Sequence, residues 1–261
     1  MKYYGDYHTH SRHSDGRQSI EQIIAAAERK GLQEVAVTDH GPMAAVIGVK
    51  NAAEYEHIKC EVKQVDISDS IPHVLMGAEA NIRDRKGTLD IEPEVITKLD
   101  ILIAGMHPYT MPTSLADGWE LFARNSLRHL GKGQRAKAKN ANTKAVVEAV
   151  NNNPEIDILS HPGLFFTIDV NEVARACIKN KVLFEINCGH EQPEISDIMK
   201  ADKQGTQFII NSDAHFPDSV GNLDYGSRVL EKLEIEPERV ANLQAGGGYE
   251  QWGKKMKTYI S

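Results

Sequence analysis

Residues 3–15 read YYGDYHTHSRHSD, a stretch that begins with aromatic residues and ends in a cluster of side chains that can bind metal ions. Its two histidines, His8 and His10, are separated by one residue. On a β-strand, side chains at positions i and i+2 point to the same side, about 6–7 Å apart along the chain. Two neutral imidazoles placed in this way can bind one divalent ion such as zinc, iron or manganese. A surface strand that carries two histidines by chance would look the same, so the rest of the sequence must distinguish the two interpretations.

Short apolar segments alternate with amphipathic segments along the remainder of the chain. The apolar segments are typical of buried strands, and the amphipathic ones predict helices between them. We expect strands over residues 3–8, 34–38, 73–79, 101–105, 156–160, 183–187 and 207–211. We expect helices over residues 19–30, 51–65, 142–151, 170–179, 194–203, 217–233 and 237–244. In the first helix, Ser19 has the position of an N-cap and Gly31 that of a helix stop.

This alternation predicts an α/β fold with a largely parallel sheet. Strand–helix steps repeated through 261 residues favour a closed or nearly closed barrel. A doubly wound open sheet is the alternative, but no G-x-G-x-x-G motif follows a strand to support a nucleotide-binding version. The chain shows no internal repeat and no linker, so we expect a single domain over residues 1–261, with residues 108–139 as its least regular part.

The composition is that of an ordinary globular protein, with 41% hydrophobic and 26% charged residues. The sequence contains no apolar run long enough to span a membrane, and MKYYGDYHTH lacks the apolar core of a signal peptide. Cys60, Cys177 and Cys188 are widely spaced, which predicts reduced thiols and a cytoplasmic location. The net charge of -7 disfavours non-specific binding to nucleic acid without excluding it.

Metal-binding side chains follow one expected strand after another. In strand order they are His8, His10 and Asp15, then Asp39 and His40, then Glu79, then His107, then His161, and finally Asp213 and His215. The carboxyl ends of the strands form the active-site rim of barrel enzymes. One histidine at such a place is usually structural, but this repeated occurrence predicts a metal site. The supply of ligands would serve two or three ions.

Glu79 is the central candidate for a carboxylate between two of these ions. Two divalent ions about 3.5–4 Å apart lower the pKa of a shared water toward about 7 and make it a nucleophile. The same ions would hold the oxygens of a phosphoryl group and neutralise charge that develops in the transition state.

Six sequence blocks resemble the PHP (polymerase and histidinol phosphatase) family: HTHSRHSDG, TDH, GAEAN, HP, SHPG and NSDAH. They occur in the family's order between His8 and about Gly221. The resemblance implies a distorted (β/α)7 TIM-like barrel with a site for two or three metal ions at the C-terminal rim of its strands. It also implies three ligand sets, namely His8, His10, Glu79 and Asp213; Glu79, His107 and His161; and Asp15, His40 and His215.

The resemblance further implies that Asp39 is a carboxylate that orients a ligand, and Glu79, Asp213 and Asp39 are the expected catalytic residues. Some family members have histidine at the position of Asp15, which leaves the third ligand set open.

The leading hypothesis is a metal-dependent phosphatase, similar to histidinol phosphatases, that hydrolyses a small phosphomonoester through a metal-bridged hydroxide. Its cofactors would be two or three ions of zinc, manganese or iron. The alternatives are a metal-dependent 3'-5' exonuclease or phosphodiesterase that acts on nucleic acid, and a non-catalytic metal-binding regulatory module.

Two further features have open roles. A basic run lies within residues 124–139, and it is either a lid that guides an anionic substrate or a solvated helix face. Its members are Arg124, Arg128, Lys132, Arg135, Lys137 and Lys139. His190 follows the sixth expected strand, where it could contact the substrate.

Overall fold

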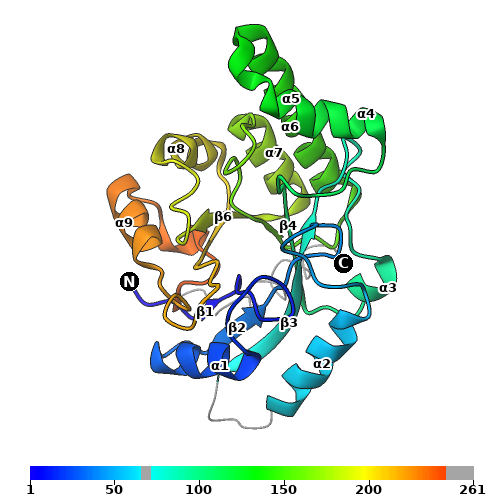
Figure 1. Cartoon of the computed structure of the whole chain (residues 1–261). Coiled ribbons are helices and arrows are strands. Elements are labelled where there is room, and N and C mark those ends of the chain that lie inside the picture. The colour runs from blue at the N-terminus through cyan, green and yellow to red at the C-terminus, as the bar shows by residue number, and fades with distance from the viewer. Residues whose placement is uncertain (66–71, 245–261) are drawn as a thin grey trace.

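Seven parallel strands lie side by side in chain order in the computed structural model of the protein, which describes residues 1–65 and 72–244 (Figure 1). The strands are β1 (Gly5–Asp6), β2 (Glu34–Val37), β3 (His73–Asn81), β4 (Ile101–Gly105), β5 (Ile158–Leu159), β6 (Leu183–Asn187) and β7 (Phe208–Asn211). Each pairs in parallel with the next one along the chain. The sheet curls into a nearly closed barrel, which confirms the predicted α/β, TIM-like fold.

The gap between β1 and β7 is bridged at two levels. At the carboxyl ends of the strands, Thr9 and Ala214 form a parallel bridge, and the His10 amide donates to the Ala214 carbonyl at 2.9 Å. Lower down, the Asn242 side chain donates to the carbonyl of Gly5 at 3.0 Å and accepts from the amide of Ile210 at 3.1 Å. These bridges hold the stretch with His8 and His10 beside the stretch that follows β7.

Helices surround the barrel (Figure 1). They are α1 (Ile20–Arg29), α2 (Glu54–Val65), α3 (Pro93–Ile96), α4 (Leu115–Asp117), α5 (Arg124–Ser126), α6 (Lys132–Asn152), α7 (Val170–Asn180), α8 (Ile195–Gln204) and α9 (Asp224–Leu233). A π-helix, η1 (Gly118–Ala123), and the 3-10 helices η2 (Arg128–Leu130) and η3 (Pro237–Arg239) complete the series. Ser19 caps α1 as expected, in a capping box with Gln22.

The inside of the barrel changes from apolar to polar along the strands. Because side chains alternate between the two faces of a strand, Ile101 and Ile103 of β4 point inward while Leu102 packs against the helices. The same alternation turns Glu79 of β3 and Glu185 of β6 inward, above the layer of apolar side chains that fills the barrel. Both glutamates are fully buried. The barrel thus has a packed apolar lower half and a charged upper rim.

Several predicted elements differ from the structure. Residues 108–139, expected to be irregular, contain α4, η1, α5, η2 and the first turns of α6. The helix expected at 142 begins at Lys132, because alanine, lysine, arginine and glutamine favour helix even where no apolar stripe marks it. The helix expected at 217 begins at Asp224.

The last expected helix, over residues 237–244, is reduced to η3. The residues after it form bridges to the barrel instead, between Val240 and Phe208 and between Leu243 and Tyr3. The strands expected at 3–8 and 156–160 are also shorter, at Gly5–Asp6 and Ile158–Leu159. The structure of these segments depends on tertiary contacts where the barrel closes. Local sequence patterns do not contain information on such contacts.

Candidate metal centre

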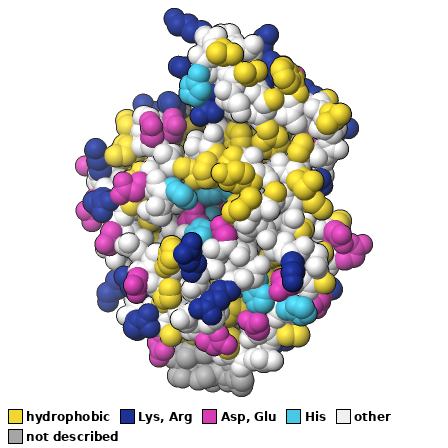
Figure 2. Space-filling model, viewed as in Figure 1, with side chains coloured by type: hydrophobic (Ala, Val, Ile, Leu, Met, Phe, Trp, Pro, Cys, Tyr) yellow, Lys and Arg dark blue, Asp and Glu magenta, His cyan; other side chains and the backbone are white. Residues whose placement is uncertain are grey.

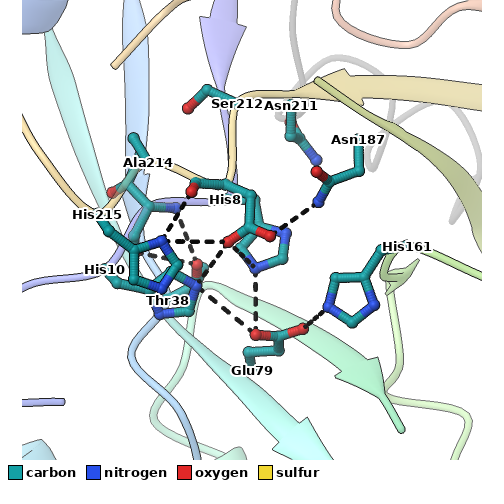
Figure 3. Close-up of polar contacts among 12 residues, drawn as sticks. His8, His10, Thr38, Glu79, His161, Asn187, Asn211, Ser212, Ala214 and His215 are labelled. Atoms are coloured by element: carbon teal, nitrogen blue, oxygen red, sulfur yellow. Dashed lines mark hydrogen bonds and ion pairs between the residues drawn. The ribbon is translucent and has the colours of Figure 1, made fainter. Parts of the chain in front are cut away.

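Glu79 lies at the centre of the polar rim, with histidines facing both of its carboxylate oxygens (Figure 3). Its Oε2 is 3.1 Å from Nε2 of His8 and 3.0 Å from Nδ1 of His40. Its Oε1 is 3.0 Å from Nε2 of His161 and 3.4 Å from Nε2 of His107. The four rings come from the ends of four different strands. This arrangement suits a carboxylate that lies between two ions.

Asp213 and Asp15 extend the cluster toward solvent. Oδ1 of Asp213 is 3.1 Å from Nε2 of His10 and 3.5 Å from Nε2 of His8. Asp15 is less buried, and its Oδ2 is 3.3 Å from Nε2 of His215. The other Asp15 oxygen is 3.8 Å from Nε2 of His40 and 4.0 Å from Nδ1 of His10. Every side chain predicted to bind metal therefore reaches one continuous cluster.

The donor atoms fall into three overlapping groups, each with its atoms within 4.8 Å of one another. The groups are His10, Asp15, His40 and His215; His8, His10 and Glu79; and His40, Glu79 and His107. His10, His40 and Glu79 each belong to two groups. Compared with the sets that the resemblance implies, the grouping also places His10 with Asp15 and His40 with Glu79. It leaves out Asp213 and His161, which reach the cluster through contacts with His10 and Glu79.

Unpartnered buried atoms show that this donor set fits divalent ions. Nε2 of His8, Nδ1 of His10, Nδ1 of His40, Oδ1 of Asp15 and both carboxylate oxygens of Glu79 are buried without a hydrogen bond. A buried polar atom without a partner is costly, and native structures rarely keep several together. Imidazole nitrogens and carboxylate oxygens that converge on one place are the ligands that zinc, manganese and iron accept.

The charges of the cluster shift one another's pKa values strongly. Burial raises the pKa of the Glu79 carboxyl, but the surrounding imidazoles, His8 and His107 foremost, hold it well below its ordinary value. Burial lowers the pKa of His8, yet the carboxylates of Glu185, Asp213 and Glu79 raise it well above its ordinary value. Burial, only partly offset by Glu79, holds the pKa of His40 well below its ordinary value. Protons on some histidines thus compensate the buried carboxylates where an ion would otherwise do so.

Glu185 supports the cluster from below and did not figure among the predicted site residues. Its Oε1 accepts from Nδ1 of His8 at 2.7 Å, and its Oε2 accepts from the backbone amide of His161 at 2.7 Å. A proton fixed on Nδ1 leaves Nε2 of His8 free to bind an ion. The signal was present in the sequence, because a glutamate in the apolar strand LFEIN has to be paired when that strand is buried.

Two other rings are held in the same manner. Asn81 accepts from Nδ1 of His107 at 2.7 Å, and the carbonyl of Asp213 accepts from Nδ1 of His215 at 2.9 Å. In both rings the remaining nitrogen, Nε2, faces the carboxylates of the cluster. Asn81, two residues after Glu79 on β3, was likewise missed by sequence reasoning.

Asp39 holds a loop and makes its bonds with serines. Its Oδ1 accepts from the Ser11 amide at 2.8 Å and also from the Ser14 hydroxyl, while its Oδ2 accepts from the Ser11 hydroxyl at 2.6 Å. Ser11 and Ser14 lie between His10 and Asp15. The side chain of Asp39 therefore acts on His10 and Asp15 through this loop.

The backbone at two candidate ligands is strained. His161 has a φ of 27° and Asp213 a φ of 55°, in the left-handed region that residues other than glycine rarely adopt. Space is also limited between the neighbouring strands, since a Cβ atom on Gly105 would lie 2.3 Å from the Ser160 hydroxyl and 3.1 Å from the His107 ring. The strained backbone at His161 and Asp213 and the close packing at Gly105 indicate that the surrounding fold fixes these candidate ligands in place.

A cavity of about 480 Å³ opens above the cluster. His190 lines it, with its Nε2 3.5 Å from Oδ2 of Asp213, so the ring lies where it could contact a substrate. A larger cavity of about 770 Å³ lies at the opposite end of the barrel, around α3 and the start of β4. In the described part of the chain no histidine lines this cavity, so its size does not make it the centre of the chemistry.

The basic run lies on the helical arm formed by α5, η2 and the start of α6, at the top of Figure 1. Arg124 pairs with Glu120 at 2.6 Å and Lys139 pairs with Asp169 at 2.7 Å. None of the six cations lines the cavity above the cluster. This placement favours a solvated helix face over a lid.

Within residues 1–65 and 72–244, no helix is both long and apolar enough to cross a membrane.

Comparisons with known proteins agree with this geometry. A protein of Thermoanaerobacter sp. (strain X514) named a probable phosphatase is 29% identical over 270 residues, which cover 100% of this chain and 95% of the relative. Another, from Shewanella piezotolerans (strain WP3 / JCM 13877), is 28% identical over 252 residues, covering 93% and 90%.

A solved structure also shares the fold. It is the histidinol phosphate phosphatase of Lactococcus lactis subsp. lactis Il1403, complexed with zinc, L-histidinol and phosphate. It superimposes with a TM-score of 0.61 at 16% identity, and the match covers 90% of this chain and 95% of that one. The sequence profile of the PHP domain matches residues 6–233. The chain therefore belongs to the PHP domain family.

Proposed function

We propose that the protein is a metal-dependent phosphatase that releases phosphate from a small phosphomonoester. At the coarser level the chain is a phosphoester hydrolase of the PHP type. The observation that carries the finer proposal is the Glu79 carboxylate, whose two oxygens are fully buried, unbonded and faced by four imidazoles. A carboxylate placed in this way is suited to lie between ions that act on a phosphoryl group.

Two or three divalent ions would be held by the clustered side chains. The proposed ligands are His8, His10, Asp15, His40, Glu79, His107, His161, Asp213 and His215. Such ions acidify water and neutralise phosphoryl oxygens when they are bound. The chain's own contribution is to fix the rings through Glu185 and Asn81, so that each presents a defined nitrogen.

The shape and charge of the cavity favour a small substrate over a nucleic acid. Its volume of about 480 Å³ suits a small molecule, and among residues 1–65 and 72–244 no lysine or arginine lines it. Proteins that bind single strands without sequence preference instead use a positively charged groove that follows the phosphate backbone. For a small phosphomonoester, the substrate candidates are histidinol phosphate, a sugar phosphate and a mononucleotide. The active protein would be cytoplasmic.

The test compares two activities of the same preparation. Phosphate release from p-nitrophenyl phosphate and nucleotide release from single-stranded DNA are measured after metal depletion and after addition of zinc or manganese, with bound metal determined in parallel. We expect metal-restored hydrolysis of the monoester only, and loss of both metal and activity in Glu79→Gln. Glu28→Gln, an exposed position on α1, is the matched control. DNA hydrolysis that exceeds monoester hydrolysis would overturn the proposal.

A further inference from the structure

One wall of the cavity above the cluster is apolar and aromatic. Apart from the candidate ligands, the cavity is lined chiefly by Ile47, Pro108, Tyr109, Phe165 and Phe216. Tyr109 is 58% exposed, Phe165 39% and Phe216 52%. Figure 2 shows hydrophobic side chains gathered directly above the histidines and carboxylates at the centre of this face. Large apolar side chains that cluster at a polar site mark a surface that a ligand covers.

Contacts hold this wall in place. The centre of the Phe165 ring lies 6.0 Å from those of His107 and His161 and 6.2 Å from that of His190, at tilted or edge-to-face angles. The carbonyl of Tyr109 accepts from the amide of Ala45 at 3.0 Å, which ties its loop to the loop after β2. The wall is therefore built against the cluster itself, and a bound ring could stack on it without a large rearrangement.

The other polar side chains that line the cavity are few, and most of them already bond within the protein or belong to the proposed metal ligands. The Ser212 hydroxyl donates to Asp6, and the Ser219 hydroxyl donates to the carbonyl of Phe216 at 2.8 Å. The carboxylates in the lining, Asp15 and Asp213, belong to the proposed metal ligands. His190 and the Tyr109 hydroxyl are left to bond with the organic part of a substrate. A polyol, a second phosphate or an ammonium group would therefore gain few hydrogen bonds from these side chains, whereas an aromatic ring would gain contact with the wall.

We propose that the substrate is the phosphate monoester of an uncharged alcohol that carries an aromatic ring, with the ring against Phe165 and Tyr109. This inference rests on the proposed phosphatase function and narrows its substrate class. It separates a neutral aryl-alkyl phosphate from sugar phosphates, from nucleotides with several phosphates, and from histidinol phosphate with its ammonium group.

The experiment measures kcat/KM of the metal-loaded enzyme for four monoesters. Methyl phosphate has no group to reach the wall, benzyl phosphate has a neutral ring, glycerol 1-phosphate has hydroxyls, and histidinol phosphate has a ring with an ammonium group. We expect benzyl phosphate to exceed methyl phosphate by about tenfold, equal to about 1.4 kcal/mol. Glycerol 1-phosphate and histidinol phosphate should not exceed methyl phosphate by that factor.

Variants of the aromatic wall test whether this wall causes the preference for benzyl phosphate. In Phe165→Ala and Tyr109→Ala, the benzyl-to-methyl ratio should fall several-fold, chiefly through a higher KM for benzyl phosphate. Trp119→Ala removes an aromatic side chain of similar exposure, 55%, from η1, outside the cavity, and should keep the wild-type ratio. Metal content is determined for each variant so that loss of ions is not mistaken for loss of binding.

The possible results distinguish a failure of the phosphatase function from a failure of the inference on the substrate. If the metal-loaded wild type hydrolyses no monoester, the phosphatase function itself fails. If it hydrolyses methyl phosphate but prefers glycerol 1-phosphate or histidinol phosphate to benzyl phosphate, the phosphatase function stands and the inference on the substrate is overturned.

Discussion

The carboxylate of Glu185 lies 2.7 Å from Nδ1 of His8 and sets the direction of that ring. Both side chains are fully buried, one on β6 and the other just after β1, so the bond crosses the interior of the barrel. The other nitrogen of the His8 ring, Nε2, then faces Glu79 and Asp213. A residue outside the three candidate ligand groups thus decides which nitrogen of His8 faces the cluster.

Glu185→Gln should therefore weaken metal binding by about 10-fold to 100-fold, the usual cost of losing such a supporting partner. The amide keeps the shape of the side chain but removes the charge that favours a proton on Nδ1 of His8 and makes the imidazole a better ligand. Competition with a chelator, followed by the free metal concentration, measures the affinity. Glu28→Gln on the exposed face of α1 is the control. Equal affinity in Glu185→Gln and wild type would show that the bond does not matter for the ions.

Metal uptake should release protons at pH 7. Burial lowers the pKa of His215, but its hydrogen bond to Asp15 and the charge of Asp213 raise it to about 9, so this ring carries a proton in the metal-free protein at neutral pH. The pKa of His8 is raised in the same direction. A histidine binds an ion only after losing its proton, so affinity should increase with pH up to about 9. Titration with zinc in buffers of different ionisation enthalpy counts the protons, and uptake without proton release would contradict the shifts.

The Asp15–His215 pair should also make the stability of the metal-free protein depend on pH. The pKa of His215 rises from 6.5 to about 9 on folding, so its contribution is complete below 6.5 and is lost as the pH rises through about 9. Although burial acts to raise the pKa of Asp15, its bond to His215 lowers it from 3.8 to about 2, so its contribution is present above 3.8 and lost toward about 2.

Thermal unfolding with a chelator present, at pH values from 6 to 10, measures this effect. The Tm of the wild type should decline through the upper part of the range more steeply than that of Asp15→Asn, in which His215 has no carboxylate partner. Parallel curves for the two proteins would mean that the pair does not stabilise the metal-free fold.

The sequence was informative where one pattern repeats and uninformative where distant segments meet. β4 and β6 have the bounds expected from their apolar runs, Ile101–Gly105 and Leu183–Asn187, and the metal-type residues were found because they recur at strand ends. Glu185 and Asn81 were missed because their importance depends on which ring lies opposite, and a linear pattern does not contain that neighbour. The helix expected over residues 237–244 was wrong for a related reason. Asn242 bonds to Gly5 of β1, more than two hundred residues away, and to Ile210 of β7, about thirty residues away.

The helical arm offers the last test, which concerns the basic run. Lys132, Arg135 and Lys137 are exposed on the first turns of α6 and none of them lines the cavity. Charges on a solvated surface beyond the Debye length of about 8–10 Å are largely screened at physiological salt. The triple substitution of these residues by alanine should therefore leave the KM for a phosphomonoester within about twofold of wild type at 150 mM salt. A KM that rises several-fold, and rises further with added salt in the wild type, would instead show that the arm guides the anionic substrate to the site.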